Sequence, residues 1–445
     1  MTRLRVPDGP KGHWLGGNLP DFRKARLDFF TQCARTHGDV VKLRFAHRPI
    51  YLVSHPDIIE EILVTHTKHL IKHFALRLNP LVLGNGLLTS EGDFWLRQRR
   101  LIQPVFVRTR IVGYGAAMVT ASERLMAGWK PGEPCDMMTE MMRVTLEIAA
   151  KVLFDAEVGG EAHAVAHALE VMQQNFLDRF NSLVPLPLWV PTPGNFRIRR
   201  AIKDLDAILY RIIRERREQK TDRGDLLSLL LHARDEDDGR GMTDRQVRDE
   251  AMTLFLAGHE TTALTLSWAW YLLAQHPEVE QKLWAELDAV LGGRTPTVDD
   301  WPKLKYAEMI GLESMRLYPP AYVIGREATA DCVVGGYHVP RGTTLLMPQW
   351  VVHRDPRFWD EPEKFRPERW GEERIKSLPK FAYFPFGGGP RMCIGQQFAM
   401  MEMVLILATI AQKFRFRMQP GATVTPQALF TLRPVPGIPG VIEPR

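Results

Sequence analysis

The stretch "FPFGGGPRMCIG", residues 384–395, places one cysteine behind three glycines, a proline and an arginine. Glycine lets the backbone approach a neighbouring group closely and adopt dihedral angles that other residues avoid. A helix is predicted to begin after Cys393, so its positive N-terminal end would lie near the sulfur. A thiolate that ligates a metal needs such an environment and shelter from water. A buried structural cysteine in a tight turn fits this loop equally well.

The composition is that of a globular protein with a basic surface. The chain has 445 residues, of which 45% are hydrophobic and 25% are charged, and its formal net charge is +6. Acidic residues are interleaved with the basic ones, so we expect no nucleic-acid partner, although an acidic protein could bind. The four cysteines lie far apart and form no C-x-x-C pair, so neither a disulfide framework nor a cysteine-rich zinc site is indicated, which fits a reducing compartment. The N-terminus shows no apolar anchor, and a soluble cytoplasmic protein is expected.

Helical patterns dominate, and no linker or internal repeat divides the chain, so residues 1–445 are interpreted as one mainly α domain with small β-sheets and no fused reductase. Alternating runs at 39–45 and 48–55 predict a hairpin, Gly335-Gly336 predicts a two-residue turn between strands, and strands return after about residue 414. The predicted helices span about 56–64, 93–127, 137–154, 161–180, 195–219, 243–275, 277–291 and 303–318.

The segment from Ala251 to Ala274 is apolar on nearly every face and is long enough to cross a bilayer. However, His259 and Glu260 fall near its centre, and an ionisable residue there costs roughly 2.5–3.5 kcal/mol on insertion scales. A buried helix is therefore the better interpretation. The "AGHETT" motif in this segment resembles the start of a zinc protease signature, but Ala263 stands where the second histidine is required. A buried polar patch satisfied by its neighbours is the simpler alternative.

Five motifs, taken in order, resemble those of the cytochrome P450 family. "WLRQR" is similar to that family's haem-propionate helix, "AGHETT" to its oxygen-activating helix segment, and "FPFGGGPRMCIG" to its haem-binding loop. "GLESMR" and "FRPERW" resemble the family's E-x-x-R pair and the arginine that completes it. The resemblance begins at "PDGPKGHWLGG" and covers nearly the whole chain, with motifs like the membrane-type branch in what would be a soluble bacterial-type member.

The resemblance implies a fold in which haem b lies between the long central helix and the cysteine loop. Cys393 would be the axial thiolate of the iron, which favours O–O cleavage, and Glu260 with Thr261 would relay protons to dioxygen. The other implied haem contacts are Trp95, Arg99, Ala257, Arg326, Phe386, Gly387, Arg391 and Gly395, of which Trp95 and the three arginines would neutralise the propionates. Glu313, Arg316 and Arg369 would form a buried network that holds the cysteine loop.

The implied activity is insertion of one atom of dioxygen into an apolar substrate such as a fatty acid, terpenoid, steroid or aromatic compound. Electrons from NAD(P)H would arrive through a separate ferredoxin or flavodoxin with its reductase, docking near Arg97, Arg100 and Lys380. A peroxide-driven peroxygenase and a non-catalytic haem-binding protein are the alternatives. Alignment with the family's pocket segments implies an apolar substrate lining made of Phe74, Leu76, Leu83, Leu87, Leu254, Tyr322, Val323, Leu429 and Phe430, each of which ordinary core packing would also explain.

Overall fold

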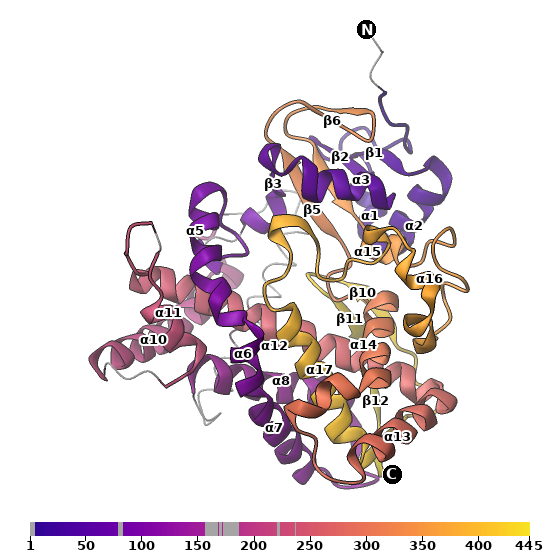
Figure 1. Cartoon of the computed structure of the whole chain (residues 1–445). Helices are drawn as coiled ribbons and strands as arrows, with labels where there is room; N and C mark the ends of the chain where they lie inside the picture. Colours follow the sequence, from indigo (N-terminus) through magenta and orange to yellow (C-terminus); the bar gives the residue numbers. More distant parts are fainter. Residues whose placement is uncertain are drawn as a thin grey trace. The chain divides into compact units, whose positions relative to one another are not determined.

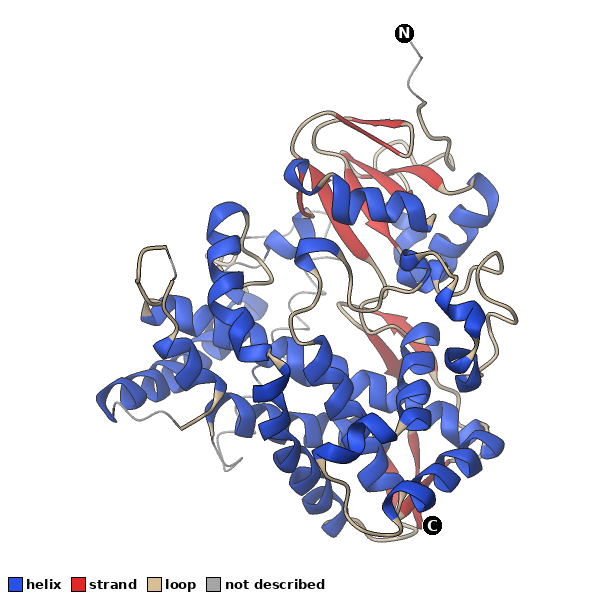
Figure 2. Cartoon of the chain, viewed as in Figure 1, coloured by secondary structure: helices blue, strands red, loops and turns tan. Residues whose placement is uncertain are grey.

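The computed structural model describes residues 5–78, 83–155, 168, 171, 187–219, 223–235 and 237–445. The chain forms two compact units, which we call the sheet unit and the helix unit. The sheet unit comprises Met1–Leu78, Met315–Cys393 and Ala428–Leu432, and the helix unit comprises Asn79–Ser314, Ile394–Gln427 and Arg433–Arg445. Figures 1 and 2 trace the elements of both units.

The sheet unit is built on a five-stranded sheet with the order β1-β2-β8-β5-β3. The predicted hairpin is confirmed as β1 (Val40–Phe45) and β2 (Arg48–Val53), which pair antiparallel. β2 pairs parallel with β8 (Thr344–Met347), with Ile50 opposite Thr344, so two distant parts of the sequence share one sheet. β5 (Ile324–Ala328) and β3 (Leu70–Lys72) complete the sheet, and both were missed because short strands carry little alternation.

The turn predicted at Gly335-Gly336 is also confirmed. β6 (Cys332–Val334) pairs antiparallel with β7 (Tyr337–Val339), and the two glycines between them have φ values of +56° and +77°. Positive φ at both central residues is what a two-residue hairpin turn of type I′ requires. The remaining elements of this unit are α1 (Leu19–Lys24), α2 (Arg26–His37), α3 (Pro56–Glu60), η1 (Glu61–Thr65), η2 (Thr67–His69), η3 (Phe74–Leu78), α15 (Gln349–Val352), η7 (Pro367–Gly371), α16 (Glu373–Lys376), η8 (Lys380–Ala382) and η9 (Gly389–Arg391).

The helix unit is organised around α12 (Asp244–Gln275), which packs against α8 (Met137–Phe154) and α17 (Gln396–Ala411). Figure 1 shows these three helices in the lower half of the view. α12 starts with a capping box, in which the Thr243 side chain and Gln246 satisfy each other's backbone N–H groups. The helix unit also contains α10 (Pro193–Gln219), α11 (Leu226–His232), α13 (Pro277–Leu291) and η6 (Val298–Lys303). Its sheet has the order β4-β12-β9, with β4 (Pro134–Asp136), β12 (Pro439–Pro444) and β9 (Phe414–Met418).

Three elements cross the division between the units, namely α14 (Lys305–Leu317), β10 (Thr425–Ala428) and β11 (Leu432–Val435). The predicted helices 137–154 and 277–291 coincide with α8 and α13. The predicted helix 161–180 lies almost wholly outside the described residues.

The single helix predicted over 93–127 is wrong. The chain forms instead α5 (Gly92–Ile102), η4 (Gln103–Phe106), α6 (Arg108–Ile111), η5 (Val112–Tyr114) and α7 (Gly115–Ala127). Pro104 lies two residues after the end of α5 and lacks the N–H that an α-helix needs at an interior position. The apolar periodicity continues through this interruption, which is why the pattern alone suggested one helix.

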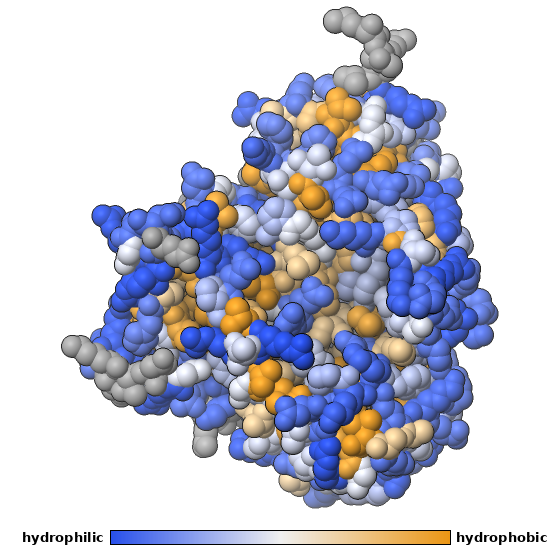
Figure 3. Space-filling view, in the orientation of Figure 1, coloured by the Kyte–Doolittle hydropathy of each residue, from blue (hydrophilic) through white to orange (hydrophobic). Residues whose placement is uncertain are grey.

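Among the described residues, no helix is both long and apolar enough to cross a bilayer. The apolar stretch within α12 is instead buried, with Trp268 and Ala269 fully enclosed. Figure 3 shows hydrophilic side chains over most of the face drawn there, with smaller hydrophobic patches between them. The interpretation of α12 as a helix through a protein core is confirmed.

Candidate functional site

The cysteine loop of the sheet unit is shaped by close backbone approaches. Gly387 and Gly389 have φ values of +73° and +66°. A Cβ at Gly389 would lie 1.8 Å from the Leu63 carbonyl oxygen, so no side chain fits there. The Cys393 N–H donates to the Phe386 carbonyl at 2.9 Å, which closes the loop. The loop is therefore fixed by its backbone, while the Cys393 side chain is exposed.

Cys393 differs from the other three cysteines. Cys33 is buried, and burial raises the pKa of its thiol to about 11. Burial likewise raises the pKa of Cys135 to about 11 and that of Cys332 above its usual range. Because a ligand thiolate must be accessible, the exposed Cys393 is the best placed of the four to ligate a metal.

Two buried side chains, His353 and Gln349, hydrogen-bond Phe384, the first residue of this loop. His353 Nε2 accepts a hydrogen bond from the Phe384 N–H at 3.0 Å, and the Gln349 side chain donates to the Phe384 carbonyl. Burial, together with the nearby charges of Arg316 and Arg354, holds the pKa of His353 well below its usual value. A neutral imidazole can accept at Nε2, so His353 is a loop support that the sequence analysis missed. Its "HRDP" sequence gave no signal for this role.

Arg316 and Arg369 converge on the backbone that follows His353. Arg316 donates to the carbonyls of His353 at 2.9 Å, Pro362 at 2.6 Å and Lys364 at 3.1 Å. Arg369 donates to the Lys364 carbonyl at 3.2 Å and to the Asp360 carbonyl at 3.0 Å. Both arginines are almost completely buried, as is Glu313, one turn before Arg316 on α14. The structure thus joins two members of the predicted network through a shared carbonyl.

In the helix unit, the polar segment of α12, residues 259–262, contacts several different elements. His259 Nε2 lies 3.1 Å from the Met142 carbonyl of α8. Glu260 accepts hydrogen bonds from Arg433 on β11 at 2.5 and 2.8 Å. The Thr262 hydroxyl hydrogen-bonds the buried carboxyl group of Glu402 on α17. These three side chains therefore connect α12 to α8, β11 and α17.

Thr261 behaves differently from these neighbours. Its hydroxyl donates to the Ala257 carbonyl of the same helix at 2.6 Å. Ala257 is exposed and Thr261 half-buried, although Leu254 and Glu260 on the same helix are buried. Residues four apart share a helix face, so α12 presents a small methyl and a hydroxyl on one accessible strip. Taken by itself, this strip has the chemistry to hold a flat apolar cofactor such as haem, and the exposed Cys393 of the sheet unit has the chemistry to ligate a metal.

The other predicted cofactor contacts are distributed between the units. Trp95 and Arg99 lie one turn apart on α5 in the helix unit, and both are half-buried. Arg326 on β5 and Arg391 in the cysteine loop belong to the sheet unit and are also half-buried. Phe386 and Gly387 precede Cys393 in the loop, and Gly395 is the N-cap of α17.

The predicted substrate residues are distributed in the same way. In the sheet unit, the Tyr322 hydroxyl donates to the Leu429 carbonyl at 2.9 Å, and the Phe74 ring lies under the Arg48 guanidinium. Leu76, Val323 and Leu429 are half-buried, and Phe430 is exposed. In the helix unit, Leu83 and Leu87 are half-buried and Leu254 is buried.

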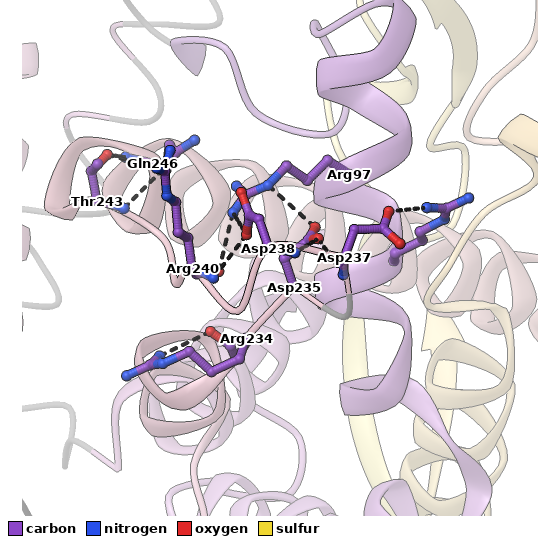
Figure 4. A network of polar contacts seen from close by, with 10 residues as sticks. Arg97, Arg234, Asp235, Asp237, Asp238, Arg240, Thr243 and Gln246 are labelled. Carbon is purple, nitrogen blue, oxygen red and sulfur yellow. Dashed lines mark hydrogen bonds and ion pairs between the residues drawn. The ribbon is translucent and has the colours of Figure 1, made fainter.

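Arg97 and Arg100, predicted to dock a redox partner, have acidic partners within the chain. Figure 4 shows Arg97 reaching into the loop that precedes α12. Its Nε lies 3.2 Å from Asp235 and its Nη2 3.6 Å from Asp238, while Arg100 pairs with Asp237 at 3.2 Å. An acidic partner would have to compete with this loop, so the two arginines are less suited to docking than their sequence suggested.

Comparison with known proteins places the chain in context. The sequence profile described as Cytochrome P450 matches residues 7–438. The chain is 37% identical to cyclooctatin synthase of Streptomyces melanosporofaciens, over 98% of this chain and 95% of that protein. It is 38% identical to cyclooctat-9-en-7-ol 5-monooxygenase of the same organism, over 92% and 89% of the two chains. It is 36% identical to pentalenene oxygenase of Streptomyces avermitilis, over 91% and 90%. These matches confirm the resemblance inferred from the five motifs.

We predict that His353→Leu destabilises the protein. The substitution leaves the buried Phe384 N–H without its acceptor, which costs about 1–3 kcal/mol. The free energy of unfolding in urea measures this loss. His338→Leu is the matched control, because His338 is partly exposed and pairs with the exposed Asp331. Equal stability changes in the two variants would contradict the role of His353.

We also predict a pH-dependent stability term from Glu402. Burial raises its pKa to about 8 in the folded protein, against an ordinary value of 4.5. The folded state therefore retains the proton more strongly, so this stabilisation is complete below about pH 4.5 and is lost as the pH rises to about 8. Melting temperatures across this range should fall more steeply for the wild type than for Glu402→Gln. Parallel curves would show that Glu402 does not titrate in this way.

Proposed function

The chain belongs to the cytochrome P450 family, and from that premise we propose that it is a haem-dependent monooxygenase whose preferred substrates are cyclic terpenoids. Such an enzyme converts R–H, dioxygen, two electrons and two protons into R–OH and water. Two relatives are named for the oxidation of cyclooctat-9-en-7-ol and of pentalenene, which favours terpenoids over fatty acids, steroids or aromatic compounds. The predicted lining of leucines, phenylalanines and Val323 is apolar enough for such substrates.

The single observation that carries this proposal is the exposed Cys393 thiol at the end of a loop that is otherwise fixed by buried contacts. Cys393 would ligate the haem iron, and the loop glycines would bring backbone N–H groups near the sulfur. Trp95, Arg99, Arg326 and Arg391 would hold the propionates. When bound, the haem supplies the activation of dioxygen.

The residues of α12 would handle protons and exclude water. The Thr261 hydroxyl is accessible on its helix, and in the structure it donates to the Ala257 carbonyl. Rotation of this hydroxyl away from the carbonyl would let it donate elsewhere. Glu260, the next residue toward the N-terminus, would replace the donated proton. This acid and alcohol favour a monooxygenase over a peroxide-driven peroxygenase or a non-catalytic haem-binding protein, neither of which needs a proton relay for dioxygen.

The electron supply and domain organisation are also proposals. We infer that NAD(P)H is oxidised by a separate reductase and that a ferredoxin or flavodoxin carries the electrons. Lys380 is exposed and remains a candidate docking residue, whereas Arg97 and Arg100 already have acidic partners. The profile match across residues 7–438 spans both units, which supports their acting together as one haem domain.

The test of thiolate ligation is the carbon monoxide difference spectrum of the dithionite-reduced protein. We predict a strongly red-shifted Soret band for the wild type and its loss in Cys393→Ser. Cys332→Ser serves as the control and should keep the band, because the Cys332 side chain belongs to the β6–β7 hairpin. A band that survives in Cys393→Ser would reject Cys393 as the ligand, and a wild type that binds no haem would reject the proposed function.

Removal of the Thr261 hydroxyl tests the proton relay. We predict that Thr261→Ala lowers the product formed per NAD(P)H consumed and raises the release of hydrogen peroxide, because protons reach dioxygen less efficiently. Thr265→Ala is a suitable control, since the Thr265 hydroxyl donates to a carbonyl of the same helix but is buried. Unchanged coupling in Thr261→Ala would contradict the assigned role. Turnover supported by peroxide alone, without NAD(P)H, would favour the peroxygenase.

A further inference from the structure

Arg433 contacts the acid of the polar segment of α12. Its Nε donates to Oε1 of Glu260 at 2.8 Å, and its Nη2 donates to the same oxygen at 2.5 Å. The Glu260 side chain is 5% exposed and the Arg433 side chain is 23% exposed. The two residues are separated by 173 positions in the sequence. The contact therefore exists only because β11 and α12 meet in the fold.

The burial of Glu260 distinguishes this pair from the exposed ion pairs of the helix unit. Arg417 and Glu443, on β9 and β12, lie 3.5 Å apart with exposed fractions of 34% and 45%. Water screens such an exposed pair, which contributes little. Water screens Glu260 far less, so removal of Arg433 would leave a carboxylate in a nearly dry site without its compensating charge.

The surroundings of the pair direct Glu260 to one side of its helix. On the other side of the polar segment, the buried His259 ring is bound through Nε2 to the Met142 carbonyl, and burial lowers its pKa. The charges of Glu260 and Arg433 act on His259 in opposite directions. A neutral histidine carries no charge that could replace that of Arg433. The Arg433 guanidinium is thus a charged group in position to orient the Glu260 carboxylate.

Thr261 has its own, separate partner. Its hydroxyl bonds to the Ala257 carbonyl, whereas the carboxylate next to it in the sequence bonds to β11. The acid and the alcohol of the proposed relay are therefore held by different parts of the structure. The position of the acid depends on a residue that does not belong to the "AGHETT" motif.

We propose that Arg433 is a positioning residue for proton delivery: it orients the Glu260 carboxylate and compensates its charge, so that Glu260 can supply protons to Thr261. This inference rests on the proposed monooxygenase function. It adds to that function a residue on the C-terminal strand β11, which the motifs of the chain do not include. Arg433 itself does not transfer the proton.

The test compares Arg433→Gln, Arg433→Lys, Glu260→Gln and the double variant Glu260→Gln/Arg433→Gln in the haem-loaded full chain. The measured quantity is hydrogen peroxide released per NADPH consumed, with electrons supplied by a ferredoxin and its reductase. This ratio requires no knowledge of the native substrate. The solvent deuterium isotope effect on this ratio is measured as well, because a residue that contributes only to folding would not change that isotope effect.

We expect Arg433→Gln to raise the peroxide fraction severalfold and to change the isotope effect, and Arg433→Lys to restore the wild-type values at least in part. The double variant should be no worse than Glu260→Gln alone, because both substitutions disable the same group. Arg417→Gln is the matched control and should leave both measurements unchanged. The free energy of unfolding of each variant, measured in urea, should show the same non-additivity for Glu260 and Arg433.

Three results would overturn the inference: a wild-type peroxide fraction in Arg433→Gln, additive effects in the double variant, or a lysine variant indistinguishable from the glutamine variant. If Arg433→Gln is less stable than the wild type but releases the same peroxide fraction, the first of these results is obtained. Arg433 then has a purely structural role. A wild type that consumes no dioxygen with NADPH would reject the proposed function itself, which separates that failure from failure of the inference.

Discussion

The buried guanidinium of Arg316 is the interaction on which the rest of the sheet unit depends. A charge in a protein core must be compensated by well-placed polar groups, and Arg316 obtains three carbonyls, from His353, Pro362 and Lys364, while its guanidinium lies over the Trp359 ring. These contacts fix the backbone from which His353 reaches the Phe384 N–H. The cysteine loop begins at that residue. The buried Arg316 thus contributes, through His353, to fixing the loop that carries the exposed Cys393.

In the helix unit, the polar residues of α12 also need partners inside the protein. A helix that is apolar on nearly all sides carries four polar residues in succession, and burial of such groups requires partners. The partners of three of these residues lie on other elements: His259 contacts α8, Glu260 contacts β11 and Thr262 contacts α17. Each of these contacts also helps to fix the position of α12. Only Thr261 turns back to its own helix while remaining accessible. The simpler alternative of a satisfied polar patch therefore describes the contacts of all four residues, and Thr261 differs from the others in being accessible.

Several features of the fold could be predicted because they depend on local chemistry. The helices α8 and α13 follow from apolar periodicity, and the β6–β7 turn follows from two glycines that accept positive φ. Strands of three residues such as β3 and β4 show too little alternation to be recognised. The arginines predicted to dock a partner show a different limit of the sequence. Charge along a sequence does not show that Asp235 and Asp238, far along the chain, already occupy Arg97.

The sequence by itself determined the family, because its motifs depend on residue types at fixed short spacings. The same motifs singled out Cys393, Glu260 and Thr261 as the residues proposed to act in the site. It also showed that α12 is a core helix, since ionisable residues at its centre disfavour a bilayer. Only the tertiary structure decided which partners those residues have. His353 supports the loop, and Arg433 holds Glu260 across 173 positions of sequence. Such contacts are set by how strands and helices pack, and hydrogen bonds act over only a few ångströms, so spacing along the chain carries no record of them.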